Sequence, residues 1–193
     1  MKIPVVGFDP SLKNWGIAEA ELDLETGFLG TPTLSLVNPR DDVGTKKTIR
    51  VNSLDLEKAE QLASGAFAAA SRAKVVFVEV PVGSQSARAM ASYGICIGIL
   101  GSLRAKGIEI IEVTPTENKK IFTGSKTATK DEMIQMARKL YPNANWPIDN
   151  RKGKGGLIVG EAEHMADAIA AIHAGVQTPV FQNLMRLLQA TKE

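Results

Sequence analysis

Residues 3–24 have the sequence IPVVGFDPSLKNWGIAEAELDL, which predicts two strands joined by a tight turn. Ile3–Phe8 is a continuous run of mostly apolar residues, which is typical of a strand buried on both faces. Asp9 ends this run, and the Pro-Ser pair that follows favours a turn. Trp15–Leu24 alternates well enough to form a second strand that pairs with the first. An acidic side chain is therefore expected at the end of the first buried strand.

The same arrangement recurs downstream, where Glu79 ends the apolar run Val75–Val78. His164 and Asp167 are three residues apart in an Ala-rich helical stretch, so they share one helical face. In open α/β sheets, ligands bind outside the carboxyl ends of the strands. Divalent cations such as Mg²⁺ prefer oxygen ligands, and a pair of ions can clamp both reacting oxygens of a phosphodiester. Together, Asp9, Glu79, His164 and Asp167 predict a metal-dependent nuclease site.

Structural roles remain alternatives for some of these residues. Asp9 precedes a turn in which an Asp side chain commonly caps its own backbone. Glu161 and Glu163 precede His164, and either is an alternative metal ligand or simply favourable charge in the first helical turn. Glu79 is harder to explain structurally, because a buried carboxylate is costly unless it is paired or metal-bound.

The order of the expected elements indicates an α/β fold with a mixed sheet. After residue 24, we expect strands at 33–37, 48–51, 75–79 and 108–113, and helices at 53–72, from Ser84 or Ser86 to 104 or 106, and at 116–122, 129–141, 160–174 and 179–191. Ser53 is the expected N-cap of the first helix, and Thr129 caps a later one. The glycines between 86 and 103 favour tight packing on the sheet over a subunit interface. Residues 143–156 are the best candidate for a mobile loop.

The composition is that of an ordinary globular domain. The 193 residues suffice for one domain, with 44% hydrophobic and 23% charged residues. Cys96 is the only cysteine, which excludes an intrachain disulfide and fits a reducing compartment. No N-terminal signal is visible, and the apolar stretch 89–103 is too short and Gly-rich to cross a membrane. We therefore expect a soluble cytoplasmic protein.

Charge is distributed unevenly along the chain. Residues 1–103 carry a net charge of −1, residues 104–154 carry +5, and residues 155–193 carry −2. A basic middle segment suits a polyanionic partner such as DNA, although an ordinary solvated surface is the alternative.

Four blocks of the sequence resemble, in the same order, the motifs of the RuvC-type Holliday junction resolvases. They are GFDPSLKNWG (7–16), Val78-Glu79 with Ser86-Ala87-Arg88, TPTENKK (114–120) followed by Thr123-Gly124 and Thr129-Lys130-Asp131, and HMADAIA (164–170). Because the four blocks span most of the chain, the match is far more specific than any single block.

This resemblance implies an RNase H-like α/β fold, with a central mixed five-stranded sheet flanked by helices, as one nuclease domain over residues 1–193. It also implies a homodimeric endonuclease of DNA recombination and repair, which resolves four-way (Holliday) or branched DNA junctions by paired, two-metal-ion phosphodiester hydrolysis. By position, the catalytic and metal-binding set is Asp9, Glu79, His164 and Asp167.

Mg²⁺ is the implied cofactor, and Mn²⁺ should also support activity because a neutral imidazole suits Mn²⁺ better. Lys119 and Lys130 match basic residues that contact DNA near the scissile phosphate. Lys126 or Lys130 could also neutralise charge in the transition state. The complete DNA-binding set that we expect is Lys13, Arg88, Lys119, Lys120, Lys126 and Lys130.

The chain also departs from the family pattern. Pro81-Val82-Gly83 stands where many bacterial relatives carry an aromatic residue, and Ser11 replaces the usual Gly. The segment 31–51 is longer than the bacterial pattern, which indicates a divergent lineage, and a phage-encoded member is one interpretation. The main alternative function is another RNase H-like nuclease that acts on RNA–DNA hybrids, flaps or forks. Two further alternatives are an actin-like ATPase or sugar kinase, and a catalytically silent junction-binding module.

Overall fold

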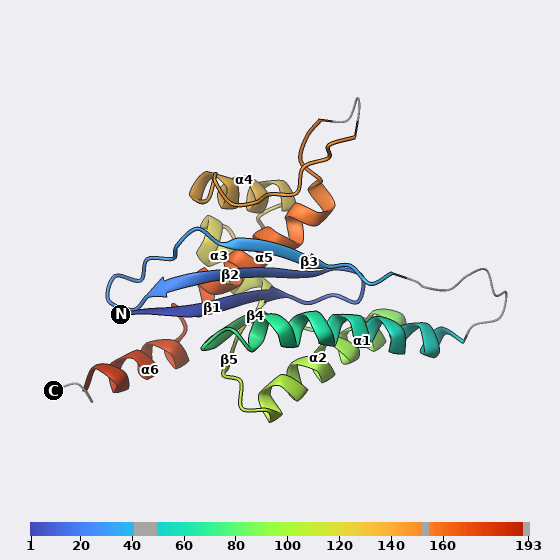
Figure 1. The fold of residues 1–193 in the computed structure, drawn as a ribbon, viewed down its shortest axis with the longest axis horizontal. Coiled ribbons are helices and arrows are strands. Elements are labelled where there is room, and N and C mark those ends of the chain that lie inside the picture. Colours follow the sequence, from blue (N-terminus) through green and yellow to red (C-terminus); the bar gives the residue numbers. More distant parts are fainter. Residues whose placement is uncertain (41–49, 152–154, 191–193) are drawn as a thin grey trace.

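The computed structural model describes residues 1–40, 50–151 and 155–190, and the side chains up to residue 187. Within these ranges, five strands form one sheet in the order β3-β2-β1-β4-β5 (Figure 1). The strands are β1 (Lys2–Asp9), β2 (Trp15–Asp23), β3 (Thr33–Val37), β4 (Val75–Glu79) and β5 (Ile110–Val113). β1, β2 and β3 pair antiparallel, whereas β4 is parallel to both β1 and β5. The predicted mixed five-stranded sheet is confirmed.

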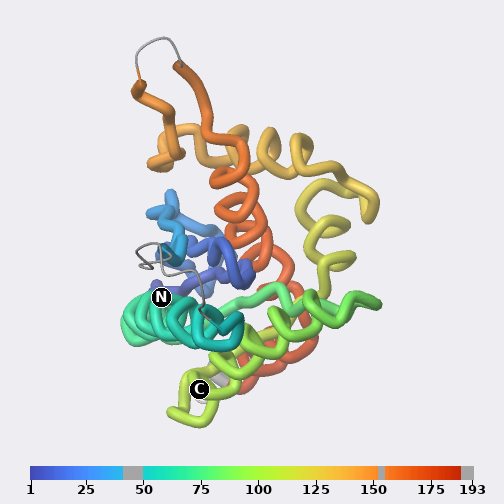
Figure 2. The backbone as a smooth tube through the Cα atoms, turned by 90° about the vertical axis from the view of Figure 1, so that its right-hand side faces the viewer, coloured from blue at the N-terminus to red at the C-terminus, as the bar shows by residue number. Residues whose placement is uncertain are grey.

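Helices cover both faces of this sheet. One face carries α1 (Val51–Ala70) and α2 (Ala87–Ala105), and the other carries α3 (Pro115–Thr123), α4 (Lys130–Leu140) and α5 (Val159–Gly175). In Figure 2 the blue strands lie between the teal and green helices on one side and the yellow and orange helices on the other. α6 (Pro179–Ala190) follows α5 and lies near the amino end of β1 (Figure 1). None of the helices in the described parts of the chain has the length and apolar character needed to cross a membrane.

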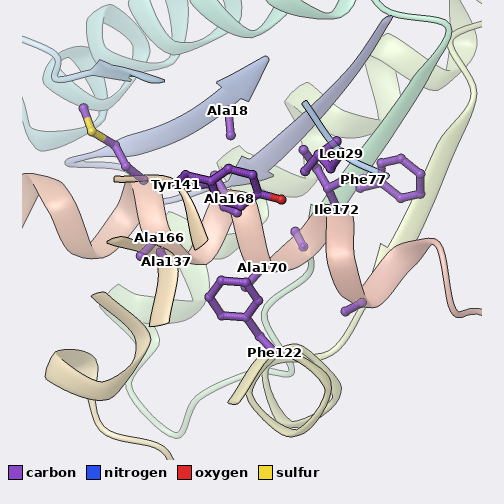
Figure 3. Close-up of a cluster of buried hydrophobic side chains, with 14 of the residues drawn as sticks. Ala18, Leu29, Phe77, Phe122, Ala137, Tyr141, Ala166, Ala168, Ala170 and Ile172 are labelled. Atoms are coloured by element: carbon purple, nitrogen blue, oxygen red, sulfur yellow. The ribbon is translucent and has the colours of Figure 1, made fainter. Parts of the chain in front are cut away.

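α5 is the central helix of its layer and lies directly on the sheet (Figure 3). Its alanines from Ala162 to Ala174 are buried, so the helix presents little side-chain bulk to the strands. Two glycines of the sheet complete this close approach. A methyl group on Gly7 would collide with the backbone carbonyl of Ala168, and one on Gly16 would collide with that of His164. The alanines of α5 and the glycines of β1 and β2 therefore allow the helix to lie close to these two strands.

The glycines of α2 do not pack on the sheet, so that prediction was wrong. Apart from the adjoining residues and backbone of α2 itself, no atom of the described residues lies within 4 Å of a methyl group placed on Gly94, Gly98 or Gly101. The buried face of α2 is formed instead by Cys96, Ile99, Leu100 and Leu103. The glycines share the opposite, solvent-exposed face. Cys96 is buried as a small apolar residue, as expected.

The start of α1 also differs from the prediction. Of the strand expected at 48–51, residues 48 and 49 lie outside the described residues, while Val51 is the first residue of α1. Ser53 is not the N-cap, because the chain is already helical there. Arg50 has the extended N-cap conformation, and its carbonyl accepts hydrogen bonds from the backbone N–H groups of Ser53 and Leu54. The backbone alone begins this helix, so no side-chain cap marks it in the sequence.

The expected mobile loop at 143–156 has anchored ends. Ile148 and Leu157 form an isolated bridge, and the Asp149 N–H donates to the Gly156 carbonyl at 2.8 Å. Asn145 donates to and accepts from the backbone of Leu34 in β3. Residues 152–154 lie outside the described residues, so mobility of the loop stays a prediction.

Candidate active site

Asp9 and Glu79 end two neighbouring parallel strands. Phe8 of β1 is the register partner of Val78 of β4, so the next residue of each strand reaches the same edge of the sheet. This follows from the parallel pairing, because the carboxyl ends of parallel strands lie side by side. The two acids are therefore neighbours although 70 positions separate them along the chain.

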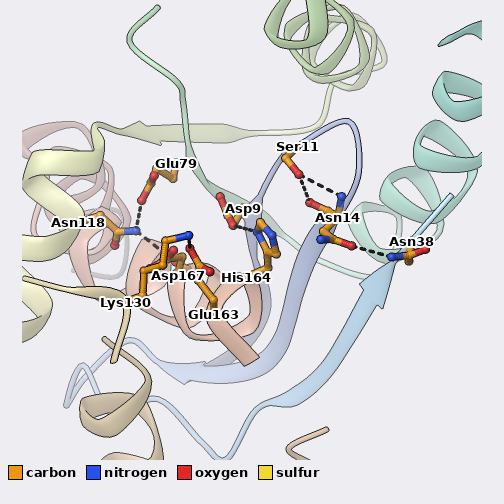
Figure 4. A network of polar contacts seen from close by, with 10 residues as sticks. All are labelled: Asp9, Ser11, Asn14, Asn38, Glu79, Asn118, Lys130, Glu163, His164 and Asp167. Carbon is orange, nitrogen blue, oxygen red and sulfur yellow. Dashed lines mark hydrogen bonds and ion pairs between the residues drawn. The ribbon is translucent and has the colours of Figure 1, made fainter. Parts of the chain in front are cut away.

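α5 brings His164 and Asp167 over this edge (Figure 4). The backbone of His164 lies against Gly16, which is the register partner of Asp9 in β2. His164 Nδ1 donates a hydrogen bond of 2.5 Å to Asp9 Oδ2, while its Nε2 has no hydrogen-bond partner among the described residues. All four residues predicted from the sequence thus meet at one place, at the junction of the sheet and α5.

Asn118 of α3 is a further member of this site that the sequence analysis did not single out. Its side chain is fully buried, and its amide group donates to Glu79 Oε2 and, at 3.2 Å, to the backbone carbonyl of Asp167. Helical spacing could have indicated this position, because Asn118 lies four residues before the buried Phe122 and so shares its face. A polar residue on a buried helical face needs a hydrogen-bond partner, so this position in the pattern indicates a polar contact inside the protein.

The carboxyl groups of the site perturb one another. Burial, followed by the charge of Asp9, raises the pKa of Glu79 to about 7, although the hydrogen bond from Asn118 opposes this shift. Burial and the charges of Asp9 and Glu79 raise the pKa of Asp167 well above its ordinary value. Burial alone would lower the pKa of His164, but the hydrogen bond and charge of Asp9 outweigh it and raise the pKa. Glu79 and Asp167 are therefore poorly solvated, and both feel the charge of Asp9.

The donor set suits a divalent cation. Carboxylate oxygens with one imidazole match the ligands of Mg²⁺ and Mn²⁺ sites, and a bound cation offsets the mutual repulsion that raises the pKa values of Glu79 and Asp167. As the side chains stand, however, no three His, Cys, Asp or Glu side chains of the described residues are close enough to hold an ion together. Holding an ion therefore requires side-chain rotations at the site.

Glu163 and Glu161 were the alternative ligands to His164. Glu163 forms an ion pair with Lys130, whose Nζ lies 2.6 Å from Glu163 Oε1. Glu161 is in the first turn of α5. Of these three candidates, His164 is the one that contacts Asp9 directly.

No protein-family model matches the chain, and no curated protein matches it. Among solved structures, T. thermophilus RuvC in complex with a Holliday junction substrate matches with a TM-score of 0.62 and 17% identity, over 94% of this chain and 96% of that one. A second Thermus thermophilus RuvC structure matches with a TM-score of 0.58 and 18% identity, over 96% of this chain and 97% of that one.

The chain has the fold of RuvC. The predicted RNase H-like architecture is therefore confirmed, and it extends over nearly the whole of both chains. At 17–18% identity the likeness establishes the fold, and the chemistry has to be argued from the site itself.

Several lysines expected to bind DNA border the acidic site of this RuvC fold. Lys119 follows Asn118 on α3, and its charge lowers the pKa values of Glu79 and Asp167. Lys130 opens α4, and the charges of Asp167 and Asp9 help to raise its pKa, after the larger effect of Glu163. Three other lysines are exposed, in the β1–β2 turn, on α3 and between α3 and α4: Lys13, Lys120 and Lys126.

Arg88 differs from these lysines. Its guanidinium binds both carboxylate oxygens of Asp55 on α1, at 2.5 and 2.7 Å, and thereby joins α2 to α1. Asp55 is buried, and the hydrogen bond from Arg88 lowers its pKa. The structure thus gives Arg88 a structural partner, which makes it the least supported member of the expected DNA-binding set.

A pocket of about 250 Å³ opens beside the acids. Besides Asp9 and Glu79, its walls come from the turns after β1 and β4, from α2 and from the start of α3: Pro10, Ser11, Pro81, Val82, Gly83, Tyr93 and Pro115. The acidic edge of the sheet is therefore open to a ligand on this side.

Proposed function

We propose that this protein is a metal-dependent endonuclease that resolves four-way or branched DNA junctions, with residues 1–193 acting as one nuclease domain. The observation that carries the proposal is that Asp9 and Glu79 end the neighbouring parallel strands β1 and β4, and that Asp167 of α5 is near enough for their charges to raise its pKa. The RuvC fold supports it, because one RuvC of this fold was solved with a Holliday junction substrate.

Asp9, Glu79 and Asp167, with His164, would hold the divalent ions. When bound, Mg²⁺ or Mn²⁺ supplies Lewis-acid stabilisation of the phosphodiester oxygens and lowers the pKa of water, and a pair of ions supplies both effects at once. His164 holds Asp9 through Nδ1, which leaves Nε2 to bind an ion or to orient water. The imidazole makes Mn²⁺ at least as suitable as Mg²⁺.

The lysines would bring the phosphate backbone to this acidic pocket. DNA and three carboxylates repel each other, and the exposed ammonium groups of Lys13, Lys120 and Lys126 would offset this repulsion by pairing with phosphates. The charge of Lys119 lowers the pKa of Glu79, and the charges of Asp167 and Asp9 help to raise the pKa of Lys130, so both lysines lie near the acids. This position suits contact with the scissile phosphate. Phosphate contacts carry no code for the type of substrate, so branch selectivity has another source.

A homodimer would supply the two active sites that paired cuts require. The exposed face of α2 carries small residues at alternating steps of four and three, which is the spacing of a coiled-coil seam: Ala87, Ala91, Gly94, Gly98, Gly101 and Ala105. Met90 and Ile97, seven residues apart, flank this seam and are 46% and 47% exposed. We propose that a second copy of α2 packs on this face.

A cleavage assay tests the proposed function. A four-way junction, a linear duplex, a Y-fork and an RNA–DNA hybrid are incubated with the protein, each with Mg²⁺, with Mn²⁺ or with EDTA. We expect symmetric paired nicks in the junction that require a divalent ion. Equal cutting of forks or hybrids would favour the other RNase H-like nucleases, and cutting in EDTA would contradict the role of the acids.

A further inference from the structure

Asn118 joins the two halves of the site. The sheet supplies Asp9 and Glu79, whereas α5 supplies His164 and Asp167. On one side, the His164–Asp9 hydrogen bond connects the two halves. On the other side, Asn118 reaches from α3 to Glu79 and to the backbone of Asp167 (Figure 4).

Only an amide meets the chemical demand at this position. Both partners of the side chain are acceptors, a carboxylate and a carbonyl, so the residue has to offer two donors without adding charge. The amide nitrogen of Asn does this, while Asp has no donor when ionised. The backbone N–H of Asn118 is not available, because it donates to the Thr114 carbonyl within α3.

Packing alone does not explain an asparagine at position 118. The side chain is 0% exposed, and its Oδ1 has no hydrogen-bond partner among the described residues. A buried acceptor without a partner lowers the stability of the fold, and an apolar residue of similar volume avoids this loss. The benefit of the amide therefore lies at its nitrogen, on Glu79.

We propose that Asn118 is a positioning residue that holds Glu79 for metal binding. By occupying Oε2, the amide fixes the rotation of the Glu79 carboxyl group and leaves Oε1 for an ion. Carboxylates that bind metals are commonly hydrogen-bonded in this way through their other oxygen, and loss of such a partner typically costs about 10- to 100-fold in metal affinity. The inference rests on the proposed metal site and adds the residue that orients one of its ligands.

Mn²⁺ binding, measured by electron paramagnetic resonance without DNA, tests the inference. Asn118→Leu keeps the approximate volume and removes both donors, and Asn118→Ser serves if the leucine does not fold. We expect the Mn²⁺ affinity to fall about 10- to 100-fold in either variant. In cleavage assays, the Mn²⁺ concentration for half-maximal rate should rise by the same factor, with kcat largely recovered at saturating Mn²⁺.

Asn145→Leu is the matched control. Asn145 is also an asparagine that makes two hydrogen bonds, to the backbone N–H and carbonyl of Leu34, but it lies between α4 and α5 and contacts β3. We expect its loss to lower the unfolding midpoint and to leave Mn²⁺ affinity unchanged. If both Asn118 variants fold and bind Mn²⁺ like the wild type, Asn118 is only structural and the inference is wrong. If the wild type itself binds no Mn²⁺, the proposed metal site fails as well, which distinguishes the two failures.

Discussion

At the scale of single residues, Asp9 is the most central group of the site. It receives the hydrogen bond from His164, and its charge raises the pKa values of both Glu79 and Asp167. Removing this one charge should therefore change the chemistry of the whole pocket more than removing any neighbour.

Asp9→Asn should abolish junction cleavage and leave junction binding intact or improved. The amide keeps the shape of the carboxyl group but is a poor ligand for a divalent ion, and the lost negative charge reduces repulsion of the phosphates. We expect a fall of at least about 100-fold in cleavage rate, because a ligand matters more than its hydrogen-bond partners. Cleavage and gel-shift assays measure the two effects. Asp149→Asn, at a remote Asp paired with Arg151, is the control, and joint loss of binding and cleavage in Asp9→Asn would contradict the assignment.

Glu79 should make the metal-free protein less stable as the pH rises. The ordinary pKa of a glutamate side chain is 4.5, and burial raises the pKa of Glu79 to about 7 in the folded protein. A raised acid pKa stabilises the fold fully below the unfolded value, and this contribution disappears as the pH rises through the folded value. The shift corresponds to about 3 kcal/mol between pH 4.5 and 7. Urea unfolding in EDTA across this range should show a larger loss for the wild type than for Glu79→Gln. Parallel curves for the two proteins would refute the shift.

At the scale of elements, the link between α1 and α2 depends on the Arg88–Asp55 pair. Arg88→Ala leaves the buried Asp55 carboxylate unpaired, and we expect a loss of about 1–2 kcal/mol in unfolding free energy, moderated because the Arg88 side chain is 53% exposed. Adding Asp55→Asn should restore most of this stability. If Arg88 instead contacts DNA, Arg88→Ala will weaken junction binding without lowering stability, and the second substitution will rescue nothing.

Helix starts were predictable where a side chain forms the cap. Thr129 caps α4 as the sequence predicts, and Ser86, one of the two serines that the sequence offered, caps α2 by accepting from the Ala89 N–H. α1 has no side-chain cap at Arg50, and there the prediction failed. The packing of the α2 glycines was predicted wrongly, because their spacing shows only that they share one face of the helix. The face that packs on the sheet is the one formed by Cys96, Leu103 and their neighbours.

At the scale of the whole molecule, the exposed face of α2 predicts how two copies meet. Ala91→Glu places a charge in the middle of this seam, whereas Ala68→Glu places the same charge on an exposed alanine of α1. We expect light scattering after gel filtration to report a dimer for the wild type and for Ala68→Glu, and a monomer for Ala91→Glu. Paired junction nicks should then become single nicks. A dimer that survives Ala91→Glu would exclude this face as the interface.

The sequence by itself determined the five strands of the sheet, most of the helices and the acids that end β1 and β4, because these features depend on the periodicity and turn chemistry of neighbouring residues. It also predicted a further strand ending at Val51, which is helical in the structure. The spacing of His164 and Asp167 on one helical face is of the same kind. The tertiary structure alone decided which side chains meet: Asn118 with Glu79, Lys130 with Glu163, and Arg88 with Asp55. These contacts join residues 33 to 39 positions apart on different elements. They exist because α2, α3, α4 and α5 dock at particular angles and depths, which the packing of the whole core sets and no local pattern records.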